Sequence, residues 1–295
     1  MVRPYVECEE EDQGFRNTGS TEECLESVVI KTAVAKPGFS FATIQEAKSL
    51  TKWKEAIAAK NIFPLYDVEE LANANTEDTV FEGRNKTYTT AKGKKVNTYN
   101  SYLGLCSHAA LMSFDGKELQ LFEMTEDGEI KGIQDDAGKI KGQSVTMNVG
   151  KRMDAMPDKP PYTPVKITYK DFKEYETRGA LLRPGFLASD VLGVFDVVLK
   201  QVLATPTRIE FTATTTCAGG SAKNKALEAG DVIVRNASGA LVTTSFVAAD
   251  PVTGIYALTG TGFATGYTVE LDGVITQVEM IIEAIEPLKL TVTQP

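Results

Sequence analysis

Histidine and cysteine, the side chains best suited to nucleophilic and metal chemistry, are scarce in this chain of 295 residues. There is one histidine, His108, and there are four cysteines, Cys8, Cys24, Cys106 and Cys217. A single histidine excludes the H-E-x-x-H zinc motif and multi-histidine catalytic metal centres. Cys106 and His108 are two residues apart, so on a helix they project about 200° from each other and are poorly placed to act as nucleophile and base. We expect two ordinary side chains of one helix.

The cysteine spacing and the apolar segments bear on the compartment. The cysteines are far apart and have no C-x-x-C spacing, which fits neither a zinc ribbon nor a disulfide framework, so we expect all four to be reduced. The first ten residues contain no apolar signal region, which favours folding in a cytoplasm. Residues 191–199 form the longest apolar stretch, well short of the ~20 residues that span a bilayer, so we expect no membrane contact.

Carboxylates are the remaining candidates for acid–base or metal chemistry. Asp127, Glu129, Asp135 and Asp136 cluster on predicted turns, but they lack the ligand order of an EF-hand, and we interpret them as solvated turn residues. With 40 acidic residues, carboxylate pairs of the glycosidase kind are unavoidable, and no feature selects one. The glycines of residues 260–266 have the wrong spacing for a dinucleotide fingerprint. We therefore expect no enzyme, no metal and no cofactor.

The charge pattern indicates contacts between protein surfaces. The net charge of -9 argues against a protein that holds nucleic acid, although DNA can pass nearby without being held. An acidic block lies near the N-terminus, at Glu7, Glu9, Glu10, Glu11 and Asp12. A basic block lies on a predicted hairpin, at Arg84, Lys86, Lys92, Lys94 and Lys95. Both blocks fit solvated faces. They also fit an acidic arm of one subunit on the basic hairpin of the next, a head-to-tail contact that closes into rings or propagates into a tube.

The composition divides the chain near residue 200. Residues 201–295 are poor in charge and rich in Thr, Val, Ile and Ala, as β-domains are. Ile209, Phe211 and Ala213 alternate with polar residues, which places them on one face of a strand. Turn signals recur at the interval of an immunoglobulin-like β-sandwich of about seven strands, although the Cys-Trp-Cys hallmark is missing. We predict a sandwich domain at 201–295.

We predict that residues 1–200 form an α+β assembly domain with an N-terminal arm and a bridging segment. Its strands are expected to be mainly antiparallel and to form a sandwich-like or barrel-like sheet. Four short helices are expected at the capping signals Ser20-x-x-Glu23, Thr43-x-x-Glu46, Thr51 and Asp67-x-x-Glu70. Residues 79–102 predict a long hairpin with a polar tip at 91–94. A helix is expected at 103–113, a surface loop at 151–164 and a helical turn at 171–176. Strands are expected at 118–125, 129–134, 139–150 and 165–169.

Three short motifs carry a resemblance to a family. They are Phe81-Glu-Gly-Arg-Asn-Lys-Thr-Tyr-Thr-Thr, Phe122-Glu-Met-Thr-Glu-Asp-Gly-Glu-Ile-Lys-Gly132 and Gly138-Lys-Ile-Lys-Gly142. They resemble virion structural proteins of tailed bacteriophages, and the domain order is most similar to that of major tail tube proteins with a C-terminal immunoglobulin-like module. The resemblance implies a virion protein of the phage tail, assembled in the host cytoplasm from copies of itself and other virion proteins. Its rings, usually hexamers, would stack into a tube for DNA ejection.

A tube that passes DNA without binding it predicts a negative inner surface, because each fixed cation adds an attractive phosphate contact. The lumen-lining candidates are Glu118, Glu123, Glu129 and Asp136. One alternative is a capsid decoration or head-fibre protein. Another is a carbohydrate-binding, adhesin-like module, which needs exposed aromatic side chains that residues 201–295 supply sparsely.

Overall fold

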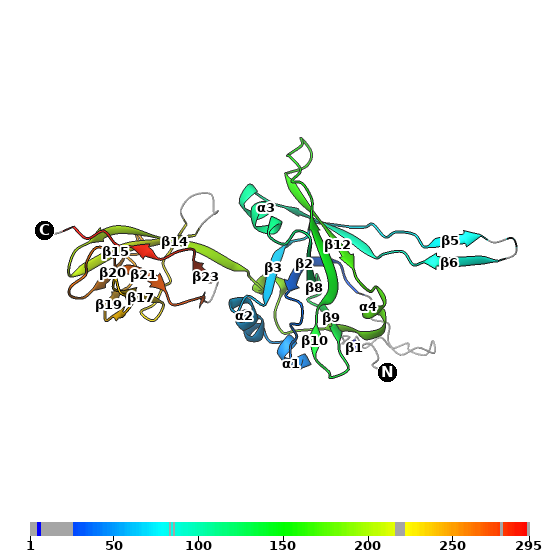
Figure 1. The fold of residues 1–295 in the computed structure, drawn as a ribbon, viewed down its shortest axis with the longest axis horizontal. Helices are drawn as coiled ribbons and strands as arrows, with labels where there is room; N and C mark the ends of the chain where they lie inside the picture. The colour runs from blue at the N-terminus through cyan, green and yellow to red at the C-terminus, as the bar shows by residue number, and fades with distance from the viewer. Residues whose placement is uncertain are drawn as a thin grey trace, which may run out of the picture. The chain divides into compact units, whose positions relative to one another are not determined.

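The computed structural model describes residues 5–6, 26–82, 84, 86–215, 222–277 and 280–293. The chain forms two compact units, Met1–Val191 and Leu192–Pro295. Both are built mainly from antiparallel strands with few short helices, which confirms the expected fold class (Figure 1). The second unit begins before residue 201 because its longest strand, β14 (Val194–Ala204), pairs with β15 (Arg208–Thr215). Residues 192–200, the last part of the expected bridging segment, therefore belong to the second unit, and the part before them belongs to the first.

The centre of the first unit is a barrel-like sheet. Its strands, in order around the sheet, are β2 (Val29–Ala35), β8 (Lys117–Thr125), β11 (Gln143–Val149), β12 (Tyr162–Tyr169), β7 (Val96–Tyr102) and β4 (Glu70–Asn73). β3 (Ile62–Asp67) closes it, because it pairs with β2 and then leads directly into β4. In the connection, Val68 N–H donates to Ile30 O at 2.8 Å and Glu69 N–H donates to Asn100 O at 3.0 Å.

Alternation along these strands fills the barrel interior. On β11, Val145 and Met147 are fully buried, while Ser144 and Thr146, which alternate with them, are not. This is the period of two that a strand with one core face requires. The other inward-facing residues come from every neighbouring strand. Examples are Val34, Tyr99, Leu119, Leu121, Val165, Ile167 and Tyr169.

An aromatic cluster fills the opposite face of β8. Trp53 is fully buried on α2 (Leu50–Ala58), 5.3 Å between ring centroids from both Phe41 and Phe122. Its Nε1–H donates to Ala47 O of α1 (Ile44–Ala47) at 2.8 Å. Thr43 caps α1 as predicted, since its Oγ1 accepts from Glu46 N–H at 3.2 Å. The α2 helix begins at Leu50, with Ser49 as its N-cap in place of the expected Thr51.

The rest of the first unit extends the sheet beyond β8. The added strands are β9 (Ile130–Gln134), β10 (Ile140–Lys141), β13 (Gly179–Leu182) and β1 (Tyr5–Val6). The helical segments are α3 (Leu105–Met112), α4 (Lys173–Arg178) and a 3₁₀ turn (Ala188–Asp190). The sequences Asp115-Gly116, Asp127-Gly128 and Asp135-Asp-Ala-Gly138 predict turns, and the turns are present, since Gly116, Gly128 and Gly138 have φ of 69°, 78° and 79°. These are left-handed values that glycine adopts without strain.

Two expected elements differ from the structure, and one lies outside the described residues. Asp67-x-x-Glu70 does not start a helix, because residues 70–73 pair with β7 as β4 and Glu70 accepts a hydrogen bond from Asn100 Nδ2 at 2.8 Å. Tertiary pairing has overridden the local helix signal. β12 begins at Tyr162, within the expected loop, because Pro164 lies opposite Asn100 in the ladder. The helix expected at Ser20-x-x-Glu23 is outside the described residues.

The second unit contains two packed sheets. The larger runs β19 (Ser245–Val247), β20 (Tyr256–Thr259), β15, β14, β23 (Ile281–Ala284) and β22 (Ile275–Thr276), with β16 (Lys223–Asn224) also on β15. The smaller runs β18 (Leu241–Val242), β17 (Val232–Arg235), β21 (Thr268–Leu271) and β24 (Leu288–Lys289). One core joins them. Ile209, Phe211 and Ala213 lie in it, fully buried as predicted.

Glu174 gives the first unit a predictable acid sensitivity. Burial raises the pKa of Glu174, but hydrogen bonds from Lys141 Nζ at 2.7 Å and Ser144 N–H at 3.1 Å outweigh it and hold the pKa below the ordinary 4.5. A lowered folded-state pKa stabilises the protein above the unfolded-state pKa and ceases to do so as the pH falls through the folded-state value. We expect Glu174→Gln to cost about 1 to 2 kcal/mol at pH 6 and less at pH 3.

Fluorescence of Trp53, the only tryptophan, measures unfolding of the first unit in urea at both pH values. Glu176→Gln is the matched control, because Glu176 is an exposed carboxylate on the same helix. Equal losses of stability between pH 6 and pH 3 in the Glu174→Gln variant and the wild type would contradict this assignment.

Candidate functional site

The candidate site is a two-stranded projecting ribbon, residues 70–100, that leaves the barrel as a continuation of β4 and β7 (Figure 1). Beyond β4, Ala74 N–H donates to Val96 O at 2.8 Å and Thr76 N–H donates to Lys94 O at 3.0 Å. The ribbon then continues as the antiparallel pair β5 (Thr79–Glu82) and β6 (Thr87–Ala91). Its outgoing strand is residues 70–82, and its returning strand follows the tip.

The projecting ribbon is exposed on both faces. Every residue from 71 to 82 is exposed, and at ~3.3 Å per residue this strand extends about 40 Å. β5 and β6 pair only with each other among the described strands. Phe81 and Tyr88 lie directly opposite each other with 60% and 55% of their surfaces exposed. An isolated ribbon is marginally stable in water, and an exposed aromatic pair on it is typical of a contact surface.

The ribbon is longer than the expected hairpin, and its tip is elsewhere. The tip lies between Glu82 and Thr87, not at 91–94. Gly93, which looked like a turn residue, lies within the returning strand opposite Thr76. A Cβ at this position would be 1.8 Å from Thr76 O, so only glycine allows the two strands to approach here. The glycine that predicted a turn is required by close packing of two strands.

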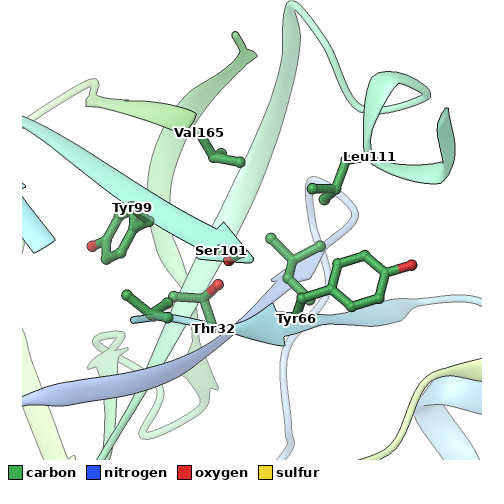
Figure 2. Close-up of a pocket in the computed structure, with 8 residues that line it drawn as sticks. Thr32, Tyr66, Tyr99, Ser101, Leu111 and Val165 are labelled. Carbon is green, nitrogen blue, oxygen red and sulfur yellow. The ribbon is translucent and has the colours of Figure 1, made fainter. Parts of the chain in front are cut away.

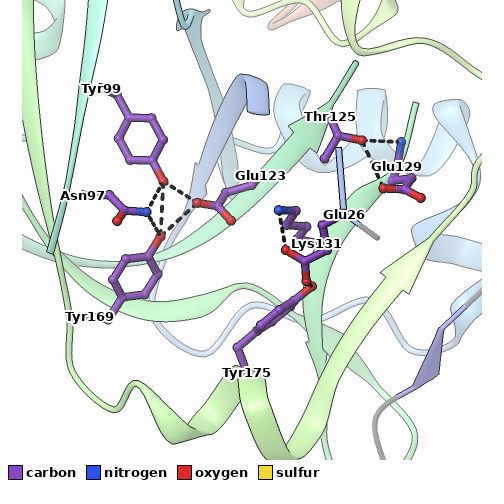
Figure 3. Close-up of polar contacts among 9 residues, drawn as sticks. All are labelled: Glu26, Asn97, Tyr99, Glu123, Thr125, Glu129, Lys131, Tyr169 and Tyr175. Atoms are coloured by element: carbon purple, nitrogen blue, oxygen red, sulfur yellow. Dashed lines mark hydrogen bonds and ion pairs between the residues drawn. The ribbon is translucent and has the colours of Figure 1, made fainter. Parts of the chain in front are cut away.

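A buried polar network anchors the returning strand in the barrel (Figure 3). Asn97 Nδ2 donates to the hydroxyl oxygens of Tyr99 at 3.2 Å and Tyr169 at 3.1 Å. The hydroxyls of Tyr99 and Tyr169 both donate to Glu123 Oε1, and the bond from Tyr169 is 2.9 Å long. Burial first, and then the charge of Glu123, raise the pKa of both tyrosines far above the ordinary value, so both stay protonated and act as donors. Lys95 Nζ lies 4.6 Å from the centre of the Tyr169 ring, a cation–π contact at the base of the ribbon.

The outgoing strand is anchored at its base by Glu70. Its carboxylate accepts from Lys159 Nζ and Asn100 Nδ2, at 2.7 Å and 2.8 Å. The hydrogen bond from Lys159, followed by that from Asn100, lowers the pKa of Glu70. Both strands of the ribbon are therefore fixed at the barrel, while their outer parts, β5 and β6, pair only with each other among the described strands.

The basic block predicted for the interface lies along the ribbon, but its members differ in role. Arg84 and Lys86 are exposed at the tip, and Lys94 is exposed on the returning strand. Lys92 Nζ is 2.6 Å from Asp78 Oδ2. Lys95 is partly buried at the base. The acidic block Glu7, Glu9, Glu10, Glu11 and Asp12 lies outside the described residues, so the expected contact between the two blocks stays a prediction.

Two of the four lumen-lining candidates are wrong. Glu123 is 5% exposed and Glu129 is fully buried, so neither can line an aqueous channel. Glu129 accepts from Thr125 Oγ1 at 3.3 Å (Figure 3). It also accepts from Arg183 Nη2 at 3.1 Å. The other two are exposed, but each has a cationic partner. Glu118 is 2.5 Å from Lys170 and Asp136 is 3.2 Å from Arg178.

Cys106 and His108 do not form a reactive pair. Cys106 is disulfide-bonded, which corrects the expectation that all the cysteines are reduced. His108 Nδ1 lies 3.0 Å from Thr163 Oγ1. Both residues belong to α3, as predicted. Across the described residues, no three His, Cys, Asp or Glu side chains are grouped to hold a metal ion. No helix in this part of the chain is long and apolar enough to cross a membrane.

The cavities differ between the units. In the barrel, a cavity of about 10 Å³ lies among Thr32, Tyr66, Tyr99, Ser101, Leu111 and Val165, which is room for about one water molecule (Figure 2). In the second unit, a hollow of about 440 Å³ is lined by both polar and apolar residues, and none of these lining residues is aromatic. The aromatic residues that a sugar-binding surface needs lie elsewhere in this unit. Phe211, Tyr256 and Phe263 are in the core.

No protein-family model matches the sequence, and no curated protein matches it. The geometry of the ribbon therefore carries the functional argument. The sequence pattern indicated the basic residues of the ribbon and Glu82, but not the acidic Glu77 and Asp78, because the hairpin was predicted to begin at Thr79 and a helix was predicted before it. The signal was present: residues 70–82 contain four acidic residues and no basic one.

Proposed function

We propose that the chain is a structural subunit that assembles with copies of itself into rings, and that the rings stack into a tube of the kind found in phage tails. The observation that carries the proposal is the free-standing projecting ribbon with its exposed Phe81–Tyr88 pair. Two strands that cover none of their own unit's core gain stability only through a partner. A ribbon anchored rigidly at one end and unsupported along its length is suited to reach a neighbouring subunit.

The phage assignment rests on the motifs in residues 81–90, 122–132 and 138–142, which resemble tail virion proteins. In the structure, the first motif lies in the outer part of the ribbon. The second covers the end of β8 and the start of β9, and the third contains β10. The net charge of -9 supports passage of DNA without binding. Glu123 and Glu129 have no part in this, since both are buried.

Electron microscopy of the purified wild-type chain tests the proposal. We expect stacked rings with a central channel. A variant with a shortened ribbon, in which Asn-Gly replaces residues 77–93 and joins Thr76 to Lys94 through a two-residue turn, should remain unassembled. Its Trp53 fluorescence should show the wild-type unfolding midpoint, because the removed residues cover no core.

Two results would contradict the proposal. A wild-type chain that stays a monomer or trimer at high concentration would favour the capsid decoration or head-fibre alternative. A shortened variant that forms rings as readily as the wild type would show that the ribbon is not part of the assembly contact.

A further inference from the structure

The two strands of the projecting ribbon carry opposite charges. The outgoing strand has only acidic residues among its ionisable side chains, and residues 84–95 of the returning strand have only basic ones. The acidic residues are Glu70, Glu77, Asp78 and Glu82. The basic residues are Arg84, Lys86, Lys92, Lys94 and Lys95. One long edge of the ribbon is therefore negative and the other is positive.

Pairing within the ribbon accounts for few of these charges. Asp78 and Lys92 form the one ion pair between the two strands among the described residues. Glu70 and Lys95 are engaged at the barrel, with Lys159 and Tyr169. In the described part of the chain, the other five side chains have no ion-pair partner. They are Glu77, Glu82, Arg84, Lys86 and Lys94.

The backbone offers a second set of unused contacts. β5 and β6 form a two-stranded sheet, so each strand has an outer row of N–H and C=O groups that no described strand pairs. Such edges are templates for strand addition. A second copy of the ribbon supplies both the strand and the complementary charge, because its basic edge matches the acidic edge of the first.

Charge and strand direction together select one arrangement. When two ribbons lie side by side with their tips in the same direction, the outgoing strand of one is next to the returning strand of the other. These strands run antiparallel, and acid faces base. When the tips point in opposite directions with two-fold symmetry, like strands meet and like charges face each other, which is unfavourable. The favourable contact is head-to-tail, so it repeats from copy to copy and closes into a ring.

We propose that ribbons of neighbouring copies pair edge to edge, the acidic outgoing strand of one against the basic returning strand of the next, to form a closed sheet of ribbons. This contact rests on the proposed self-assembly and specifies its interface. Phe81 and Tyr88 lie on one face of each ribbon, so the closed sheet has a continuous apolar face. Assembly through this contact weakens as salt screens the exposed charges.

Charge-reversal variants test the contact in trans. Glu77→Lys with Glu82→Lys reverses both unpaired charges of the acidic outgoing strand, and Lys86→Glu with Lys94→Glu reverses two of the three unpaired charges of the basic edge. We expect each variant alone to lose assembly at least tenfold by sedimentation, and an equimolar mixture to form rings that contain both chains in equal numbers. A chain with all four substitutions should assemble alone. Lys36→Glu with Lys151→Glu and Glu126→Lys with Glu176→Lys are the matched controls, because they reverse exposed charges away from the ribbon.

The outcomes separate this contact from the proposed function. A wild-type chain that never assembles would contradict both the proposed self-assembly and the paired ribbons. If the wild type forms rings, and each variant does so alone or their mixture does not, self-assembly stands and the paired ribbons are wrong. Unchanged Trp53 fluorescence in each variant shows that loss of assembly is not loss of folding.

Discussion

Replacing Gly93 with alanine is expected to abolish the proposed ring assembly while both units stay folded. The added Cβ would lie 1.8 Å from Thr76 O and 2.8 Å from Thr76 C, far inside van der Waals contact. These atoms are backbone, so no side chain can rotate away. The two strands must separate at this point, where Gly93 N–H also donates to Asp78 Oδ1 at 2.8 Å. The outer ribbon loses its alignment with the barrel.

The loss should be confined to the ribbon. The atoms nearest an added Cβ belong to Thr76 and Glu77, which are both exposed, so we expect the free energy of unfolding measured by Trp53 fluorescence to change by less than about 1 kcal/mol. Amide hydrogen exchange should accelerate in residues 74–94 alone. Gly185→Ala is the control, because a Cβ there meets nothing within 4 Å. A Gly93→Ala chain that assembles as the wild type does would show that the outer ribbon is not needed.

Removing Arg183 should give the largest loss of stability in the first unit. Glu129 is fully buried, and the Arg183 guanidinium contacts its Oε1 through Nη2 at 3.1 Å and Nε at 3.3 Å. Arg183→Met keeps much of the side-chain volume but leaves a buried carboxylate without its cation. Breaking a buried ion pair in this way costs about 3 to 5 kcal/mol. Urea unfolding at pH 7, followed by Trp53 fluorescence, measures the loss.

A second substitution separates the lost pair from simple loss of packing. Glu129→Gln in the Arg183→Met background removes the charge and keeps a group that can accept from Thr125 Oγ1. We expect the double variant to recover more than half of the lost stability, because the cost comes from the isolated charge. If the double variant is as unstable as Arg183→Met alone, the pair contributes through shape and not through charge.

Local patterns in the sequence predicted the parts of the fold that depend on neighbouring residues. The Asp-Gly turns at Gly116 and Gly128, the cap at Thr43 and the buried face of Ile209 and Phe211 all follow from one to four adjacent positions. β14 was missed although residues 191–199 are the most apolar stretch of the chain. It pairs with the adjacent β15, but its first residues pair in parallel with β23, where Val197 lies opposite Ala284, and no local pattern reports that distant partner.

In the candidate site too, the sequence predicted some features and the structure was needed for others. The charges of the ribbon are visible in the sequence, and only their placement on two antiparallel strands needed the structure. Burial of Glu123 and Glu129 was not predictable, because the groups that make it tolerable are far along the chain. Tyr169 is 46 residues from Glu123, and Arg183 is 54 residues from Glu129. A buried carboxylate requires such partners, and pairing of distant strands supplies them.

The continuity of the projecting ribbon with β7 determines how the subunit responds to mechanical tension. A pull along the returning strand is directed along β7, which is paired with β12 from Val96 to Tyr102. The hydrogen bonds of an antiparallel ladder are perpendicular to the strands, so this force loads them together in shear and does not open them one at a time. Because β12 is a strand of the barrel wall, paired with both β7 and β11, tension applied to a ribbon reaches the core of the first unit without passing through a flexible hinge. In a stack of rings, each barrel would then act as a stiff link, and the tube would bend or stretch at the contacts between subunits.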